Sequence, residues 1–346
     1  MHPILVTLPT PWGKLPIYSY GVMLGTSLII AWYIIMWLGS RKDGLDREVM
    51  ANCFIATAVS AIAGARILYI FTNLHEFHTF SQLFALRSGG LVAYGGFLGG
   101  LVGSWGYLRL KKVPLAPWAD AVAPTLGTGL AFTRVGCYLY GCDFGKPLAA
   151  DAPGWLKSLG TFPHWNLGAD AQQFVCAEAQ QGSPAWVHHV KTMHLPMDAS
   201  ASLPVHPTQI YESLAGLAIF GISMLVWRHR QFRGQVILVA AMAYGLWRFT
   251  IEFVRDDPER GAMFGFSTSQ LISLGIVPVC VLGYVILRKR AIERGEPAKL
   301  KEIEAAATAA AEAEKAAEKA GAKSDKPAGD KGPPSSGAKR KIKRRK

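Results

Sequence analysis

Seven mostly apolar runs of about 20 residues are the feature that most limits how this chain can fold. In a helix, a run of that length is long enough to cross the hydrocarbon core of a bilayer. The first run has no small-residue cleavage site after it, so we expect a retained span rather than a removable signal. We therefore predict an all-α, polytopic membrane protein whose spans cover residues 18–39, 50–72, 90–108, 119–140, 207–227, 234–254 and 267–287.

Composition agrees with a membrane protein and argues against a nucleic-acid-binding protein. Charged residues make up 18% of the 346 residues, against about 25% in an average soluble protein. The net charge is +13, but the stretch from Lys289 to Lys346 has 17 Lys or Arg and 9 Asp or Glu, which gives +8. The five cysteines have no paired CxxC spacing, so they predict neither a disulfide framework nor a zinc site.

The distribution of positive charge between the runs predicts the orientation. Loops on the cytoplasmic side of membrane proteins carry an excess of Lys and Arg. The opposite connections here are poor in them, with Arg87 in one and Lys146, Lys157 and Lys191 in another. We therefore place the N-terminus outside and the C-terminus in the cytoplasm. The cytoplasmic connections then hold Arg41, Lys42, Arg47, Arg109, Lys111, Lys112, Arg228, Arg230, Arg233, Arg288, Lys289 and Arg290.

The positions of the apolar runs predict a membrane domain followed by a tail. Residues 1–290 form the seven-helix domain, and its polar 142–205 loop, rich in Trp, His, Pro and Gly, is expected to form an extracytoplasmic cap. Residues 291–346 are a low-complexity, basic cytoplasmic tail, expected to be largely disordered with a helical tendency in its Ala/Glu/Lys part. The tail is either solvated or held against anionic lipid.

Charged residues inside the apolar runs are the first indication of function. Each costs roughly 2.5 to 3.5 kcal/mol near the bilayer centre. Arg248 and Glu252 can form a salt bridge one helical turn apart, but Arg134 has no acidic residue within one turn. A guanidinium group suits a phosphate, which lipid headgroups supply, so we predict a phospholipid site. The polar residues on the outer half of the spans are Arg134, His206, Gln209, Tyr211, Glu212 and Arg248.

Two further patterns allow a functional and a structural interpretation. The glycine-rich segment 89–103 contains Gly95 and Gly96, and small residues there let lipid or another helix approach the backbone. His206 precedes Pro207 at the start of the fifth run, where the helix dipole favours neutral imidazole. That histidine is either a hydrogen-bonding or proton-accepting group or a structural one.

Several motifs resemble the phosphatidylglycerol–prolipoprotein diacylglyceryl transferases of bacterial plasma membranes. The resemblance covers about residues 17–288 and leaves the tail outside. HPTQIYES and YGLWRFTIEFVRDD are its most specific motifs. The full set is IYSYG (17–21), GARILY (64–69), GGLVAYGG (89–96), RVGCYLYGCDFGK (134–146), HPTQIYES (206–213) and YGLWRFTIEFVRDD (244–257).

The resemblance implies transfer of the diacylglyceryl group of phosphatidylglycerol to the thiol of a lipobox cysteine in a prolipoprotein. The products are a thioether-linked precursor and glycerol 1-phosphate. Arg134 and Arg248 match the two arginines that hold the lipid phosphate in the family. Other functional positions of the family fall on Tyr20, Gly145 and Tyr244, and its HPxQxYE element falls on His206, Gln209, Tyr211 and Glu212.

The chain departs from the family pattern at three positions. Tyr94 replaces a histidine proposed as the proton acceptor, while Cys137 and Cys142 replace an asparagine and a glutamate. A phenol is a poor base at neutral pH, so either Tyr94 orients other groups or His206 removes the proton. The two cysteines pair only if the helix ends near Gly141. The predicted catalytic residues are Arg134, Arg248, His206, Tyr94 and Tyr244, and the predicted substrate-binding residues are Tyr20, Gly95, Gly96, Gly145, Gln209, Tyr211, Glu212 and Glu252.

No metal or cofactor is expected, and the expected partners are phosphatidylglycerol, the lipobox segment and the bilayer, with no nucleic acid. Two other functions stay open on the sequence. One is a transferase of the same scaffold with another lipid donor or acceptor, which the three departures favour. The other is a non-enzymatic lipid-binding or transport protein, although no inverted repeat typical of transporters is evident.

Overall fold

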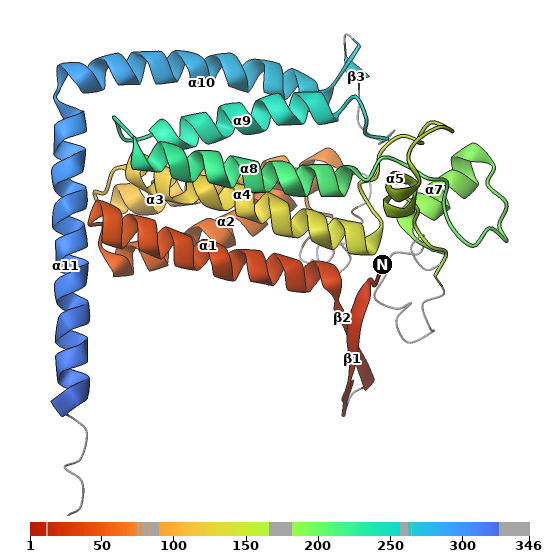
Figure 1. The fold of residues 1–346 in the computed structure, drawn as a ribbon, viewed down its shortest axis with the longest axis horizontal. Coiled ribbons are helices and arrows are strands. Elements are labelled where there is room, and N and C mark those ends of the chain that lie inside the picture. Colours follow the sequence, from red (N-terminus) through yellow and green to blue (C-terminus); the bar gives the residue numbers. More distant parts are fainter. Residues whose placement is uncertain are drawn as a thin grey trace, which may run out of the picture.

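Seven helices lie at the seven apolar runs and pass side by side along the molecule in this computed structural model (Figure 1). The structure describes residues 1–11, 13–74, 77, 83, 90–165, 182–256, 262–263 and 265–324. The predicted helical core is therefore confirmed. The helices are α1 (Ser19–Asp43), α2 (Arg47–Thr72), α3 (Ala93–Leu110), α4 (Leu115–Tyr140), α8 (Thr208–Arg228), α9 (Gln235–Ile251) and α10 (Thr268–Glu293).

Length and hydropathy mark four of these helices, α1, α2, α8 and α10, as membrane-span candidates, and α9 is a shorter apolar helix of 17 residues. The sequence did not predict two small antiparallel hairpins. One joins β1 (Ile4–Thr10) to β2 (Gly13–Tyr18), and the other joins β3 (Ala262–Met263) to β4 (Phe266–Ser267). The first hairpin precedes the first apolar run and the second lies just before α10, so neither interrupts the helical core.

Local signals explain where the helices begin and end. The Asp46 side chain accepts a hydrogen bond from the Val49 amide at 2.8 Å and so caps α2. Ser267 forms a capping box with Gln270 at the start of α10. Gly141 ends α4 with φ +83°, a left-handed conformation that glycine adopts at little cost.

The glycine-rich segment holds α2 and α3 together. A Cβ atom on Gly95 would lie 2.4 Å from the Gly64 carbonyl oxygen, and one on Gly99 would lie 2.2 Å from the Ser60 carbonyl oxygen. A Cβ on Gly96 would make ordinary contacts with Ala61 and Ala65 of α2, at 3.6 and 3.7 Å. The glycines of this segment therefore allow α3 to pack closely against α2, as the helix-packing interpretation predicts.

Buried polar groups connect the helices at the end of the bundle where α1 finishes. Asp120 on α4 accepts hydrogen bonds from the amides of Gly234, Val236 and Ile237, at 2.7, 3.0 and 3.1 Å. These amides open α9 and have no partner within that helix. The carboxylate of Asp43 pairs with the buried Arg230 guanidinium beside it. Both carboxylates therefore fix the ends of helices that meet there.

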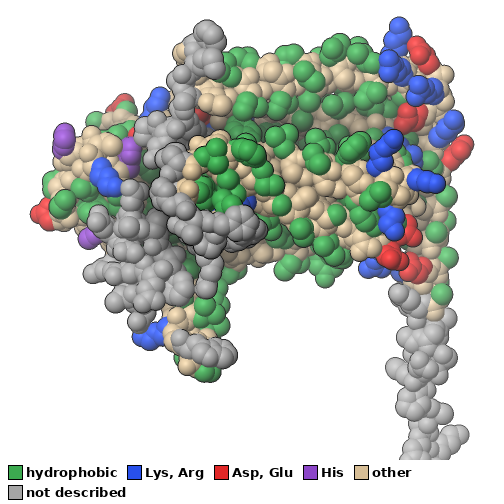
Figure 2. All heavy atoms as spheres, turned by 180° about the vertical axis from the view of Figure 1, so that it is seen from behind, with side chains coloured by type: hydrophobic (Ala, Val, Ile, Leu, Met, Phe, Trp, Pro, Cys, Tyr) green, Lys and Arg blue, Asp and Glu red, His purple; other side chains and the backbone are tan. Residues whose placement is uncertain are grey.

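The two ends of the bundle are built differently (Figure 1). At one end lie the N-terminus, the β1–β2 hairpin and the described part of the 142–205 loop, with helices α5 (Gly154–Leu159) and α7 (Pro184–Met193). Helix α11 (Glu296–Ser324) runs across the other end of the bundle. Lys and Arg gather at the α11 end, while hydrophobic side chains cover the sides (Figure 2).

The Ala/Glu/Lys part of the tail is a docked helix, which goes beyond the helical tendency expected from composition. Lys42 pairs with Glu304 at 3.3 Å, and the Arg233 amide donates to Glu296 at 3.0 Å. Leu300 and Ala307 are buried. Residues 325–346, expected to be disordered, lie outside the described part of the chain, as do Arg87 and Cys176.

Candidate functional site

One buried carboxylate, that of Glu212, faces three guanidinium groups. Glu212 lies in the second turn of α8 and is 1% exposed. Its Oε2 atom is 2.5 Å from Nε of Arg134 on α4 and 3.2 Å from Nη1 of Arg255, which follows α9. Its Oε1 atom is 3.9 Å from Nη1 of Arg248 on α9. Two arginines singled out in the sequence therefore meet at one carboxylate.

A second carboxylate, that of Asp143, joins two of the same arginines. Asp143 lies just after the Gly141 turn that ends α4. Its Oδ2 atom is 2.7 Å from Nη1 of Arg134, and its Oδ1 atom pairs with Nη2 of Arg255. Burial alone raises the pKa of Asp143, but the charges of Arg134 and Arg255 outweigh it and hold that pKa well below its usual range. Asp143 is therefore ionised at neutral pH.

Arg248 connects this group of charges to α10 and α3. The group, called the arginine cluster below, consists of Arg134, Asp143, Glu212, Arg248, Glu252 and Arg255. Its Nη1 atom is 2.7 Å from Oε2 of Glu252, so the one-turn salt bridge expected from the sequence is present. Its Nη2 atom donates to Oγ of Ser269 at 3.0 Å, and that hydroxyl lies 3.5 Å from the Tyr94 hydroxyl. Tyr94 is thus linked to Arg248 through Ser269.

The expectation that Arg134 lacks an acidic partner is wrong. Its partners Asp143 and Glu212 come from the turn after α4 and from α8, and distances along one helix could not reveal either. The pairs use Nε and Nη1, and among the described residues Nη2 has no partner, while the side chain is 18% exposed. Arg134 therefore keeps donors that an anion can reach.

Three functional candidates were missed in the sequence: Asp143, Arg255 and Ser269. Arg255 follows Arg248 by seven residues, which is two helical turns, and it belongs to the YGLWRFTIEFVRDD motif. Asp143 directly follows the glycine turn. The sequence did contain a signal for two of them. Asp143 and Arg255 lie at the ends of the fourth and sixth apolar runs, which already contained Arg134 and Arg248.

Three short segments beside the cluster are held together by backbone hydrogen bonds. The Gly145 amide donates to the His206 carbonyl at 3.0 Å, the His206 amide donates to the Lys146 carbonyl at 2.9 Å, and the Lys146 amide donates to the Val254 carbonyl at 2.8 Å. A Cβ atom on Gly145 would lie 2.6 Å from the Val254 carbonyl oxygen. Gly145 is therefore required for this close approach.

The HPTQIYE segment mainly supports the turn after α4. Gln209 is fully buried and its Nε2 donates to the Cys142 carbonyl at 2.6 Å, while Thr208 donates to the Asp143 carbonyl at 2.7 Å. The Oε1 atom of Gln209 is buried without a partner among the described residues. Ring centroids of His206 and Tyr211 lie 6.3 Å apart. These contacts fix the backbone of the turn, so that the Asp143 carboxylate stays within reach of Arg134.

The two remaining tyrosines lie at the edge of the cluster. Tyr20 on α1 meets α4 at Gly136, where an added Cβ would lie 3.1 Å from the Tyr20 Cα. Tyr244 on α9 is 38% exposed and within electrostatic range of Arg248 and Glu212. Tyr20 is 42% exposed, and both tyrosines are within electrostatic range of Arg134.

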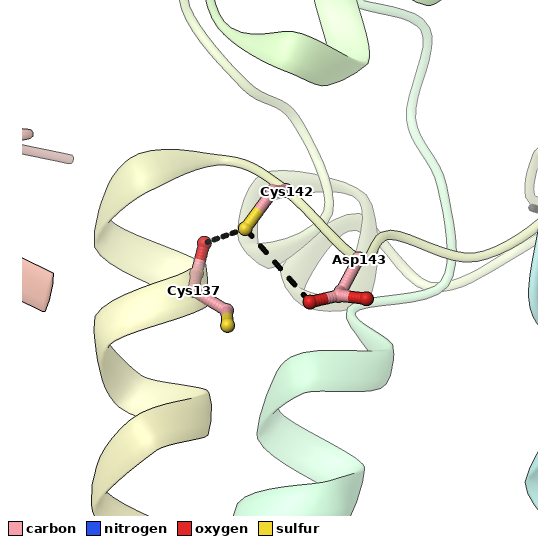
Figure 3. A group of neighbouring side chains, drawn as sticks. All are labelled: Cys137, Cys142 and Asp143. Atoms are coloured by element: carbon pink, nitrogen blue, oxygen red, sulfur yellow. Dashed lines mark hydrogen bonds between the residues drawn. The ribbon is translucent and has the colours of Figure 1, made fainter. Parts of the chain in front are cut away.

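Two free thiols lie beside Asp143, as Figure 3 shows. One ligand atom from each of Cys137, Cys142 and Asp143 lies within 4.8 Å of the others. Asp143 is already paired with two guanidinium groups, whose charge would repel a metal ion here. A hydrogen bond with Cys137, and burial, raise the pKa of the Cys142 thiol well above its usual range. We assign neither a metal nor a disulfide to these residues, although α4 does end at Gly141.

The burial of His189 in the cap predicts that the stability of the protein depends on pH. It is fully buried, its Nδ1 accepts from the Leu203 amide at 3.2 Å, and its Nε2 has no partner among the described residues. Burial, then the neighbouring His188, lower the pKa of His189 to about 4, against a smaller opposing effect of Asp256. An unfolded chain therefore binds more protons than the folded one between about pH 4 and 6.5.

We expect the free energy of unfolding to fall by roughly 2 kcal/mol as pH drops from 6.5 to 4.5. Thermal unfolding of the detergent-solubilised protein at both pH values measures this. His189→Asn keeps an acceptor for the Leu203 amide but does not titrate, so its pH dependence should be weaker. Equal pH dependence of the two proteins would contradict this role of His189.

A family model and individual known proteins that resemble this chain carry the same description. The family model described as prolipoprotein diacylglyceryl transferase matches residues 6–287. The chain is 31% identical over 305 residues to a phosphatidylglycerol–prolipoprotein diacylglyceryl transferase of Corynebacterium efficiens, covering 82% of this chain and 84% of that protein. It is 27% identical over 290 residues to the Clostridium tetani protein of that name, covering 84% and 99%. Helix α11 lies outside the family match.

Proposed function

Because the chain belongs to the prolipoprotein diacylglyceryl transferase family, we infer that it transfers a diacylglyceryl group from phosphatidylglycerol to a prolipoprotein. The acceptor is the thiol of the lipobox cysteine. Its sulfur attacks the glycerol carbon that bears the phosphate ester, and the bond between that carbon and the phosphate oxygen breaks. The products are the thioether and glycerol 1-phosphate, and the thiol proton is lost to a base.

The convergence of Arg134 and Arg248 on Glu212 is the observation that carries this assignment. Negative charge accumulates on the phosphate as it leaves, and fixed guanidinium groups stabilise that charge most when they are already held in place. Asp143, Glu212 and Glu252 provide this fixation. The unused Nη2 donors of Arg134 support its role as the group that receives the phosphate.

We assign proton removal to His206 and an orienting role to Tyr94. An imidazole changes charge near neutral pH, whereas a phenol does not. The backbone of His206 is hydrogen bonded to Gly145 and Lys146, next to the Asp143 turn. Tyr94 is linked to Arg248 through Ser269, which supports a role in fixing that guanidinium.

The donor's acyl chains have an apolar groove beside the cluster. A groove of about 640 Å³ between α8 and α9 begins at Tyr211, which precedes Glu212, and continues past Ala218 to Ile222. Its walls are almost entirely apolar, which suits hydrocarbon. A phospholipid with its phosphate at the arginines can therefore keep an acyl chain along these helices.

The proposed membrane arrangement has seven crossings in the bacterial plasma membrane. The cap and N-terminus then lie outside, where the lipobox cysteine of a secreted precursor arrives, and α11 lies in the cytoplasm. The gathering of Lys and Arg at the α11 end supports this orientation (Figure 2). In this arrangement, the arginine cluster, at the ends of its helices next to the cap, is at headgroup depth.

Purified protein, phosphatidylglycerol and a lipobox peptide provide the test. We expect a thioether-linked peptide and glycerol 1-phosphate from the wild type, and loss of both products with Arg134→Ala. A lipobox peptide with serine in place of cysteine should give no product, and phosphatidylethanolamine and phosphatidylcholine should be poor donors. Transfer from another lipid in preference to phosphatidylglycerol would identify a different donor and contradict the assignment.

A further inference from the structure

A second concave site lies at the opposite end of the bundle from the arginine cluster, between α1 and α11. Its volume is about 620 Å³. Tyr33, Met36, Trp37, Ser40 and Arg41 line it from α1. These positions repeat at the three- and four-residue spacing of one helix face. Ala307, Ala310, Ala311 and Glu314 line it from α11 with the same spacing.

Within the described part of the chain, two arginines at this site have no partner, whereas two neighbouring cations do. Arg41 is half-buried and Arg47 is exposed, and neither has an ion pair or hydrogen bond within the described part of the chain. By contrast, Lys42 pairs with Glu304, and Arg230 pairs with Asp43. Glu314 also lines the site, so its formal charge is +1. The site therefore attracts an anion.

Away from the arginines, the wall formed by α1 is mostly aromatic and apolar, and its two aromatic side chains are exposed. Tyr33 is 70% exposed and Trp37 is 42% exposed, although both are large and lie on a helix apolar enough to cross a membrane. These side chains continue along α1 away from the arginines. A ligand that fills the site must therefore be anionic at one end and apolar along the other, which is the chemistry of a phospholipid at a membrane surface.

We propose that the groove between α1 and α11 binds an anionic phospholipid, with its phosphate at Arg41 and Arg47 and an acyl chain along Tyr33 and Trp37. The three-residue turn between α1 and α2 brings the two arginines to one side, and the Lys42–Glu304 pair holds α11 over them. The lipid is then part of the contact between α11 and the bundle. This site is separate from the one that binds the donor lipid.

Binding of phosphatidic acid to the full-length protein in non-ionic detergent, followed by native mass spectrometry, tests the proposal. The variant Arg41→Gln/Arg47→Gln should bind it about 30-fold more weakly, since each basic residue near the surface contributes about 1 kcal/mol. The matched control Arg109→Gln/Lys112→Gln removes the same charge from exposed residues of another connection and should bind as the wild type does. Phosphatidylcholine should bind weakly to all three proteins.

Two further measurements separate this proposal from simpler explanations. Ala311→Phe keeps both arginines but fills the groove, so it should also weaken binding; inorganic phosphate should not displace the lipid. Transfer to the lipobox peptide should be unchanged in the arginine variant, because the catalytic cluster lies at the other end of the helices. Equal losses in both charge variants, or displacement by phosphate alone, would overturn the proposal.

Discussion

Arg248→Ala is expected to lower diacylglyceryl transfer by about 10²- to 10³-fold, the usual effect of removing one fixed donor to a developing anion. Arg248 pairs with Glu252, donates to Ser269 and lies 3.9 Å from Glu212, so its guanidinium is held in the cluster before substrate arrives. The rate of thioether formation on the lipobox peptide is the measurement. Insertion and yield should remain normal, since Glu212 keeps Arg134 and Arg255 as partners.

Arg248→Lys is the informative companion variant. It keeps the positive charge but loses the planar fork that can bond Ser269 and a phosphate together. We expect activity between those of the wild type and the alanine variant, chiefly through a lower kcat. If Arg248→Ala retained wild-type transfer, the proposed role of the cluster in binding the leaving phosphate would be wrong.

Glu212→Gln should destabilise the protein by about 3 to 5 kcal/mol, because it removes the carboxylate that compensates buried guanidinium groups. Glu212 is 1% exposed and Arg255 is 4% exposed, so water cannot replace the lost charge. Arg134, Arg248 and Arg255 would then face one another with only Asp143 and Glu252 to balance them. Thermal unfolding in detergent should show a lower midpoint, and transfer should fall as well.

Glu252→Gln is the matched control for that prediction. It is the same chemical change in the same cluster, but Glu252 pairs with Arg248 alone among the described residues. We expect a smaller loss of stability, about 1 to 3 kcal/mol. Equal effects of the two substitutions would mean that Glu212 is not the centre of the charge network.

The resemblance found in the sequence is confirmed by the family match over residues 6–287. The helices were also predictable, because each apolar run is long and continuous and hydrophobic length is a local property of sequence. The contacts that individual residues make between the helices were less predictable. Gly95 was predicted as a substrate-binding residue, with helix packing as the alternative interpretation of its segment. The structure shows that it packs against Gly64 of α2.

Arg134 is the clearest case of a residue whose environment the sequence could not give. Nothing within one turn of it is acidic, so it looked unpaired, yet Asp143 and Glu212 both contact it. Glu212 lies 78 positions further along the chain, on a helix that follows the whole cap. Its distance from Arg134 depends on how α4 packs against α8.

The sequence by itself determined that this chain forms apolar helices, that charged residues lie within them, and that its motifs belong to one transferase family. Only the tertiary structure decided that three arginines share one glutamate, that Asp143 joins two of them, and that α11 docks against α1. The reason is physical. Helix formation depends on neighbouring residues, whereas the pairing of buried charges depends on which helices come together in space.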